Sequence, residues 1–209
     1  MLRFRYKVLG GLMAGLLLAA APLAADAALP RPVPLRNALL TAADLPGGYS
    51  SDASGSMAFV SDLATDTNIC DRQVSHGSVN TAQATFIRGI PGPMLFETLS
   101  ATGPRMARAI VAGIAAAPHR CRNLNDAGGA AVLRLSPMRV PRLGDAAAGL
   151  AFTVRPAAVN MTIQGRLISV ARRGVTVTIL LVNAPRKDQR SLNLIAATAI
   201  RKLDRILVF

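Results

Sequence analysis

Two cysteines, Cys70 and Cys121, are the first candidates for chemistry in this sequence. A pair of cysteines in an exported chain favours a disulfide bond, because exported proteins fold under oxidising conditions. Such a bridge would close a loop of about 50 residues and contribute up to about 4 kcal/mol in the chain-entropy model. The alternative is a redox or metal site that also uses Asp71 and His119. A zinc site needs four nitrogen or sulfur ligands, and the sequence offers too few at the usual spacings. We therefore expect a Cys70–Cys121 disulfide and no metal site.

The groups that could act as general acids or bases are few and scattered. Glu97 is the only glutamate, and we expect it on a helix, as a surface residue or an ion-pair partner. Asp126 and Asp145 fall in predicted loops, so nothing pairs them as a glycosidase would require. His76 lies in a serine-rich loop with no partner acid or nucleophile to orient it. His119 lies at an expected helix end, where a protonated imidazole would interact favourably with the helix dipole.

The familiar catalytic motifs do not occur in the sequence. It has no Gly-x-Ser-x-Gly elbow, no His-Glu-x-x-His pair and no phosphate-binding glycine-rich loop. We therefore expect a non-enzymatic protein with no catalytic residues and no cofactor.

The first 27 residues have the parts of an export signal. Three basic residues lie among the first seven, and residues 8–21 follow without a charge. Residues 25–27, Ala-Asp-Ala, fit the small-x-small rule for signal cleavage. The uncharged stretch is shorter than the roughly 20 residues of a membrane span. We expect cleavage after Ala27 and a secreted or cell-envelope location. The alternative is an uncleaved signal segment that anchors the chain in a membrane.

The chain is strongly basic, with 24 Lys and Arg against 11 Asp and Glu and a net charge of +13. The excess lies in residues 105–209, which hold 17 basic and four acidic residues. Such a surface attracts anionic lipids or envelope polymers, but it is also typical of a solvated surface in an arginine-rich proteome. We expect no nucleic-acid partner, because the few aromatic residues lie mostly in apolar runs and are better interpreted as core.

The length of 209 residues and the 51% hydrophobic content predict one globular domain. Residues 28–37 form a proline-rich lead-in, and residues 38–209 form the domain. In its first part, Thr41 is a candidate helix cap, with Asp44 three residues later as in a capping box. A strand is expected over residues 82–88. A helix is expected from Pro93 to Ala117, because its apolar residues recur close to a 3.6-residue period.

Four strands and a final helix are expected in the second half of the domain. The strand ranges are 131–135, 150–155, 160–170 and 175–182. In the third strand the apolar residues change parity, which predicts a bulge near residues 165–167. Arg172-Arg173-Gly174 is a tight hairpin turn, and the short links between strands imply antiparallel pairing. With a helix over residues 185–206, the expected fold is α+β: an antiparallel sheet of about five strands with two main helices on one face.

Several short motifs are shared with one protein family. They are Leu39-Leu40-Thr41-Ala42-Ala43-Asp44-Leu45-Pro46, a cysteine before a strand, Gly92-Pro93 before Leu95-x-Glu97-x-Leu99, a cysteine closing a helix, Leu143-Gly144-Asp145-Ala146, and Arg172-x-Gly174. Over residues 38–207 the chain resembles the extracellular sensor-like domain found behind mycobacterial and other actinobacterial membrane Ser/Thr kinases. The same domain also occurs alone in exported proteins.

The resemblance implies a cupped antiparallel sheet with packed helices, a cleft for an unidentified ligand, and no enzymatic activity. None of the family's functional residues is carried over to this chain. The kinase-linked domains tend to have two disulfides, whereas this chain has cysteines for one. We therefore expect a secreted sensor-like domain that binds an apolar or anionic ligand, a small molecule or a lipid, in a cleft. The alternative is a basic interaction protein that adheres to anionic envelope polymers or lipid surfaces.

Intact-mass analysis of the exported protein under non-reducing conditions tests the two processing predictions. We expect a chain that starts at Ala28 and is two hydrogen masses lighter than its reduced form, because export removes the signal and permits the disulfide. A chain that retains Met1 would instead mean an anchor, and two alkylatable thiols would rule out the bridge.

Overall fold

The computed structural model describes residues 34–51, 80–89, 92–121, 123–125, 131–156, 162–183 and 189–207. The expected signal peptide and residues 28–33 of the lead-in lie outside the described residues. In chain order, the elements are α1 (Leu35–Ala38), η1 (Ala42–Asp44), β1 (Ser50–Ser51), β2 (Asn80–Ile87), β3 (Met94–Ala101), α3 (Pro104–Arg120), β4 (Asn123–Asn125), β5 (Ala131–Met138), β6 (Ala146–Pro156), β7 (Ile163–Arg172), β8 (Val175–Val182) and α4 (Gln189–Ile206).

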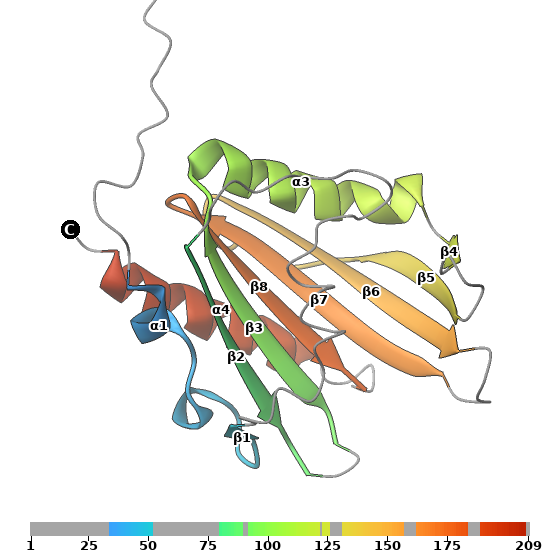
Figure 1. Cartoon of the computed structure of the whole chain (residues 1–209), viewed down its shortest axis with the longest axis horizontal. Helices are drawn as coiled ribbons and strands as arrows, with labels where there is room; N and C mark the ends of the chain where they lie inside the picture. Colours follow the sequence, from blue (N-terminus) through green and yellow to red (C-terminus); the bar gives the residue numbers. More distant parts are fainter. Residues whose placement is uncertain are drawn as a thin grey trace, which may run out of the picture.

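The strands form one eight-stranded antiparallel sheet in the order β1-β2-β3-β8-β7-β6-β5-β4 (Figure 1). The α+β class is therefore confirmed, and the expectation of about five strands is wrong. Two of the additional strands, β1 and β4, have only two and three residues, too few to show an alternating pattern. The third is β3, which the sequence places in a helix.

The segment expected to be one helix from Pro93 to Ala117 is a strand followed by a helix. β3 is buried along most of its length. A short continuous apolar run of this kind has the same appearance in a buried strand and a buried helix, so its periodicity misleads. Gly103 separates the two elements with φ 85°, and Pro104 occupies the first turn of α3. Pro118, expected to end the helix, lies inside its last turn.

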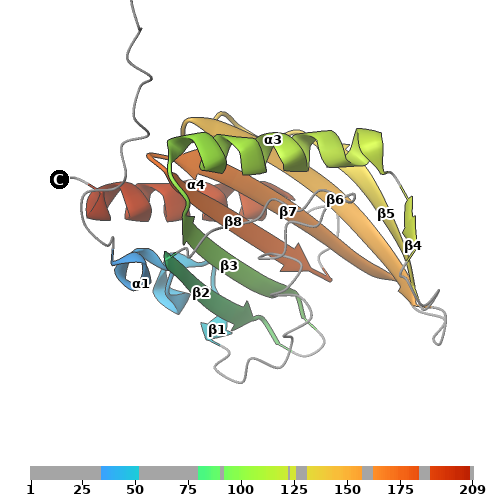
Figure 2. The ribbon, with the colours of Figure 1, turned by 45° about the horizontal axis from the view of Figure 1, so that its top comes forward.

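The two long helices pack on opposite faces of the sheet, so the expectation of helices on one face is also wrong. Figure 2 shows α3 across one face and α4 behind it. Alternate residues of β8 enter the two cores: Ile179 and Leu181 pack with α4, whereas Leu180 packs with α3. Every residue of β8 is buried, because side chains on both faces of this strand are covered.

The β7–β8 hairpin corrects one expectation and confirms another. Pairing between the two strands runs without interruption from Gly165 opposite Val182 to Arg172 opposite Val175, so no bulge lies near residues 165–167. The change of apolar parity in β7 reflects burial on both faces instead. The tight turn is present: Arg173 and Gly174 both have positive φ, 47° and 81°, as in a two-residue type I′ hairpin.

Two glycine-to-alanine substitutions should change the stability in opposite directions. Gly174 has φ 81°, and an added Cβ would lie 3.2 Å from the Gly103 Cα, so Gly174→Ala should lower the free energy of unfolding by about 1–2 kcal/mol. Gly113 lies within α3, and a Cβ there meets nothing within 4 Å. Gly113→Ala should therefore raise the free energy of unfolding by up to about 1 kcal/mol. Chemical denaturation measures the free energy of unfolding of both variants. An equal loss of stability in both would contradict the different backbone environments of Gly174 and Gly113.

Candidate functional site

The most unusual group in the structure is Glu97, which is buried in the core with 1% of its surface exposed. β3 places it between Leu95 and Leu99 in the strand pattern, on the face that packs with α4. The expectation of a surface residue on a helix is therefore wrong. Once residues 94–101 are read as a strand, Glu97 has the parity of its apolar neighbours two residues away on each side, and this is the sequence signal for its burial.

One oxygen of the Glu97 carboxyl group is hydrogen-bonded and the other is not. The Leu40 backbone N–H donates to Oε2 at 2.7 Å, whereas Oε1 has no hydrogen-bond partner among the described residues. Burial raises the pKa of Glu97 from 4.5 to about 7, and the nearby Asp44 charge adds to this. The Leu40 hydrogen bond and the Lys202 charge act in the opposite direction. Near neutral pH the carboxyl group is therefore close to half protonated.

A solvent-accessible ion pair lies beside this buried group. Thr41 and Asp44 form the expected capping box at η1, with the Thr41 backbone N–H 2.8 Å from Asp44 Oδ2. Lys202 Nζ of α4 donates to the same oxygen at 2.6 Å. The Lys202 hydrogen bond is the largest cause of the lowered pKa of Asp44, about 2. Residues 40–44, which we call the strap, are thus tied to β3 through Glu97 and to α4 through Asp44.

The strap is suited to holding structure rather than to proton transfer with a substrate. A carboxyl group with a pKa near 7 has the acidity that general acid–base catalysis needs. Glu97, however, is enclosed by the core, so a bound substrate would have to displace the strap to reach it.

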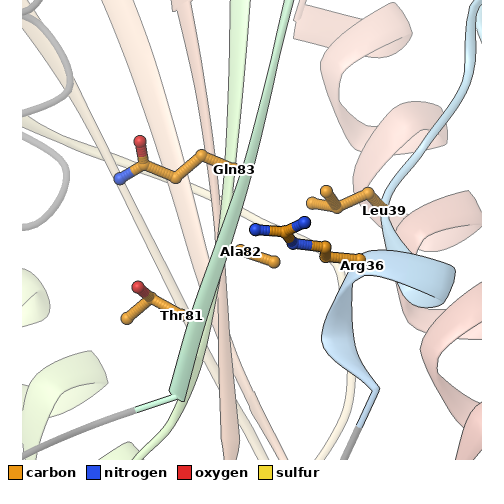
Figure 3. A pocket seen from close by; sticks show the side chains of 5 residues that line it. All are labelled: Arg36, Leu39, Thr81, Ala82 and Gln83. Atoms are coloured by element: carbon orange, nitrogen blue, oxygen red, sulfur yellow. The ribbon is translucent and has the colours of Figure 1, made fainter.

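An open pocket of about 450 Å³ lies next to the strap, between α1 and β2. Figure 3 shows the Arg36 guanidinium and the Leu39 side chain on the same side of β2 as Ala82, and Thr81 and Gln83 pointing to the other side of the strand. The pocket therefore follows the edge of β2, with one cation and two apolar side chains on its α1 side. None of its described lining residues has a carboxylate.

A second candidate surface is the part of the sheet that α4 leaves uncovered. Arg166 pairs with Leu181, a residue of the core beneath α4, so its strand face is the α4 side of the sheet. On the same side, Arg134 lies opposite Thr153 and Arg155 lies opposite Val132. Arg134, Arg155 and Gln164 are exposed there. We call this surface the open sheet face; it is formed by Val132, Arg134, Ser136, Ala151, Thr153, Arg155, Gln164 and Arg166.

None of the described carboxylates lies on the open sheet face, and each of them is engaged elsewhere in the fold. Asp204 receives two hydrogen bonds from Arg172, at 2.6 and 3.1 Å, and Asp145 binds the same arginine at 3.4 Å. Asp44 binds Lys202, and Glu97 is buried. These four are the only acidic residues in the described ranges, so each is engaged within the fold.

The other predicted site residues are not brought together. Cys70, His76 and Asp126 lie outside the described residues, so the Cys70–Cys121 disulfide remains a prediction. Cys121 is half-buried at the end of α3, with its Sγ 3.5 Å from the Ala117 carbonyl oxygen. His119 is exposed in the last turn of α3. In the described ranges, no three His, Cys, Asp or Glu residues cluster as metal ligands would.

Among the helices of the described ranges, none has the length and apolar character to cross a membrane. No family model matches the chain, and no curated protein sequence does.

Two solved structures are similar to the chain in fold. The extracellular domain of PknH from Mycobacterium tuberculosis is 12% identical, with 77% of this chain and 79% of that chain covered and a TM-score of 0.44. A putative uncharacterized protein from Mycobacterium smegmatis, the Rv0999 ortholog, is 14% identical, with 75% and 78% covered and a TM-score of 0.41. Both are mycobacterial proteins.

The buried carboxyl group should make the stability fall as pH rises. The folded state keeps the Glu97 proton up to pH about 7, whereas the unfolded chain releases it near 4.5. The free energy of unfolding should therefore decrease by about 3 kcal/mol between pH 4.5 and 7. In Glu97→Gln, which retains an oxygen to accept from Leu40 but cannot ionise, this decrease should be absent. Urea denaturation at several pH values measures it.

The ion pair supplies the control for this measurement. Asp44 has a lowered pKa, so its contribution is present above pH 3.8 and is lost as pH falls toward 2, outside the window of Glu97. Asp44→Asn should remove the contribution of Asp44 on the acid side and leave a slightly smaller fall between pH 4.5 and 7, because the Asp44 charge is the smallest cause of the raised Glu97 pKa. A Glu97→Gln variant that retains the wild-type fall would show that another group titrates there.

Proposed function

We propose that this chain is a non-enzymatic, extracytoplasmic sensor-like domain that binds a small amphipathic anion in the pocket between α1 and β2. The observation that carries the proposal is the pocket's composition: Arg36 provides a positive charge next to the apolar Leu39 and Ala82. The volume of about 450 Å³ lies within the range of small-molecule sites. A ligand with one anionic head and a short apolar body matches these groups.

The charge of Arg36 is available to such a ligand. Its side chain is exposed, and each described carboxylate is engaged elsewhere in the fold. An anion at the guanidinium group would thus form a charge-assisted hydrogen bond without displacing an existing ion pair.

The position of the pocket supports a sensing role. Leu39 lines the pocket, and the next residue, Leu40, donates its N–H to the buried Glu97. A ligand that packs on Leu39 therefore contacts the residue that directly precedes the strap. The next residue, Leu40, forms the hydrogen bond that ties the strap to β3. Binding and the docking of the strap are linked through adjacent residues, so a ligand that prefers the docked strap stabilises it.

A second candidate function is adhesion to anionic envelope material. It is favoured by the excess of arginine on the exposed surface, since all four acidic residues in the described ranges are already engaged. This function would use charge spread over the surface rather than a pocket.

The pocket proposal is tested with octanoate as the probe and octanamide as its neutral counterpart. Isothermal titration should detect octanoate and show much weaker binding of octanamide. Arg36→Gln should weaken octanoate binding roughly 10- to 100-fold, because it removes a hydrogen bond to a charged group.

The matched control is Arg190→Gln, which removes the same charge from an exposed position on α4. It should leave octanoate affinity within about twofold of the wild type, since a distant exposed charge is screened by salt. Equal affinities for octanoate and octanamide, or equal losses in the two variants, would contradict a site at Arg36.

A further inference from the structure

The open sheet face lies on a different part of the molecule from the pocket. It uses the first half of β5, the second half of β6 and the start of β7, whereas the pocket lies between α1 and β2. In the order of the sheet, the four strands β3, β8, β7 and β6 separate β2 from β5. Binding at one surface therefore does not require the other.

The open sheet face presents its cations close together. Arg134 of β5 lies opposite Thr153 of β6. Arg155 is two residues beyond Thr153 on β6, so the two arginines are diagonal neighbours. The Cα atoms of such neighbours lie about 7–8 Å apart. Both side chains are exposed. Arg166 lies on the same face on the neighbouring strand β7, with 7% of its surface exposed.

Neutral hydrogen-bonding side chains surround these cations. Thr153 lies opposite both Arg134 and Gln164, and the Ser136 hydroxyl lies at the side of Arg134 toward the end of β5. None of the four described acidic residues belongs to this face. Within the described part of the chain, an anion that reaches this face meets donors and positive charge without a competing carboxylate.

The surroundings of the face determine what shape of partner can reach it. α4 packs on β7 and β8 beside it, and a packed helix stands about 10 Å high. The chain after β5 forms a second border: Val140 packs over Gly149, and Gln189 of α4 donates to the Arg139 carbonyl oxygen at 3.0 Å. The face is thus bordered by α4 on one side and by residues 139–140 on another.

A sheet face bordered by a packed helix fits a thin chain better than a bilayer. Anchoring in the membrane interface needs an apolar face that enters the lipid boundary, and charge alone adds only about 1 kcal/mol per basic residue. In the described ranges, the exposed large hydrophobic residues are Val132, 40% exposed, and Leu194, 60% exposed, and they belong to different elements. A linear polymer can lie along the sheet beside α4 and place successive anionic groups on Arg134 and Arg155 at once.

The geometry points to the open sheet face as a binding site for a linear polyanion, held by Arg134 and Arg155 together with the neighbouring hydroxyl and amide groups. This gives the adhesion function a defined surface and goes beyond the pocket proposed above, on which it does not depend. The chemistry that identifies the partner is a flexible chain with closely spaced phosphate groups.

Binding of fluorescently labelled linear polyphosphate tests this proposal, with inorganic phosphate and phosphatidylglycerol vesicles measured alongside. We expect the wild-type protein to bind polyphosphate with an affinity that falls steeply as salt rises, because each arginine contact releases counterions. Inorganic phosphate should compete poorly. Vesicle binding without polyphosphate binding would overturn the proposal in favour of a lipid surface.

The decisive comparison is between two double variants that remove the same charge. Arg134→Gln with Arg155→Gln should weaken polyphosphate binding at least tenfold and make its salt dependence shallower. Arg190→Gln with Arg205→Gln removes two exposed arginines from the outer face of α4 and should change the affinity less than threefold. Equal losses in both variants would mean that net charge alone binds the polymer, which overturns the assigned site.

Two further measurements distinguish loss of the site from loss of the fold and from binding at the pocket. Thermal unfolding of both double variants should match the wild type, because all four substituted side chains are exposed. Arg36→Gln should bind polyphosphate as the wild type does. If Arg36→Gln loses polyphosphate binding while the Arg134 and Arg155 variant retains it, the polyanion site belongs at the pocket and the open sheet face is excluded.

Discussion

The fold depends on burying both faces of its central strands. β8 has no exposed residue, and its side chains enter two separate cores, one beneath α3 and one beneath α4. A strand of this kind cannot be stable with helices on one side only, because its second face would expose a row of valine, isoleucine and leucine to water. The two helices are therefore required on opposite faces, and the remaining elements are arranged around the layers that they create.

The two helices cover different parts of the sheet, and this difference creates the candidate surfaces. α3 packs on β5 to β8, whereas α4 packs on β7, β8 and α1. Beyond the edge of α4, the strands β5 and β6 return to an alternating pattern, and polar residues such as Arg134, Thr153 and Arg155 face the uncovered side. Exposed arginines are tolerated there because no helix has to desolvate them.

The sequence predicts elements with local signals and misses those decided by tertiary packing. The Arg172–Gly174 hairpin and the Thr41–Asp44 cap are set by residues within a few positions of each other, and both are present. β3 is misread because two-sided burial removes the alternation that identifies a strand. The open sheet face is also missed, since it depends on which strands a distant helix covers.

The buried Glu97 shows how a single polar group can connect these layers. A carboxyl group in the core is unfavourable when charged, and its raised pKa measures that penalty. The Leu40 N–H offsets part of it, and the charge of Lys202 on α4 offsets a smaller part. Both compensating groups lie on elements outside the sheet, so the protonation of Glu97 depends on the docking of the strap and α4 as well as on its burial. The same hydrogen bond that accommodates the carboxyl group therefore makes the pocket-forming segment responsive to its charge.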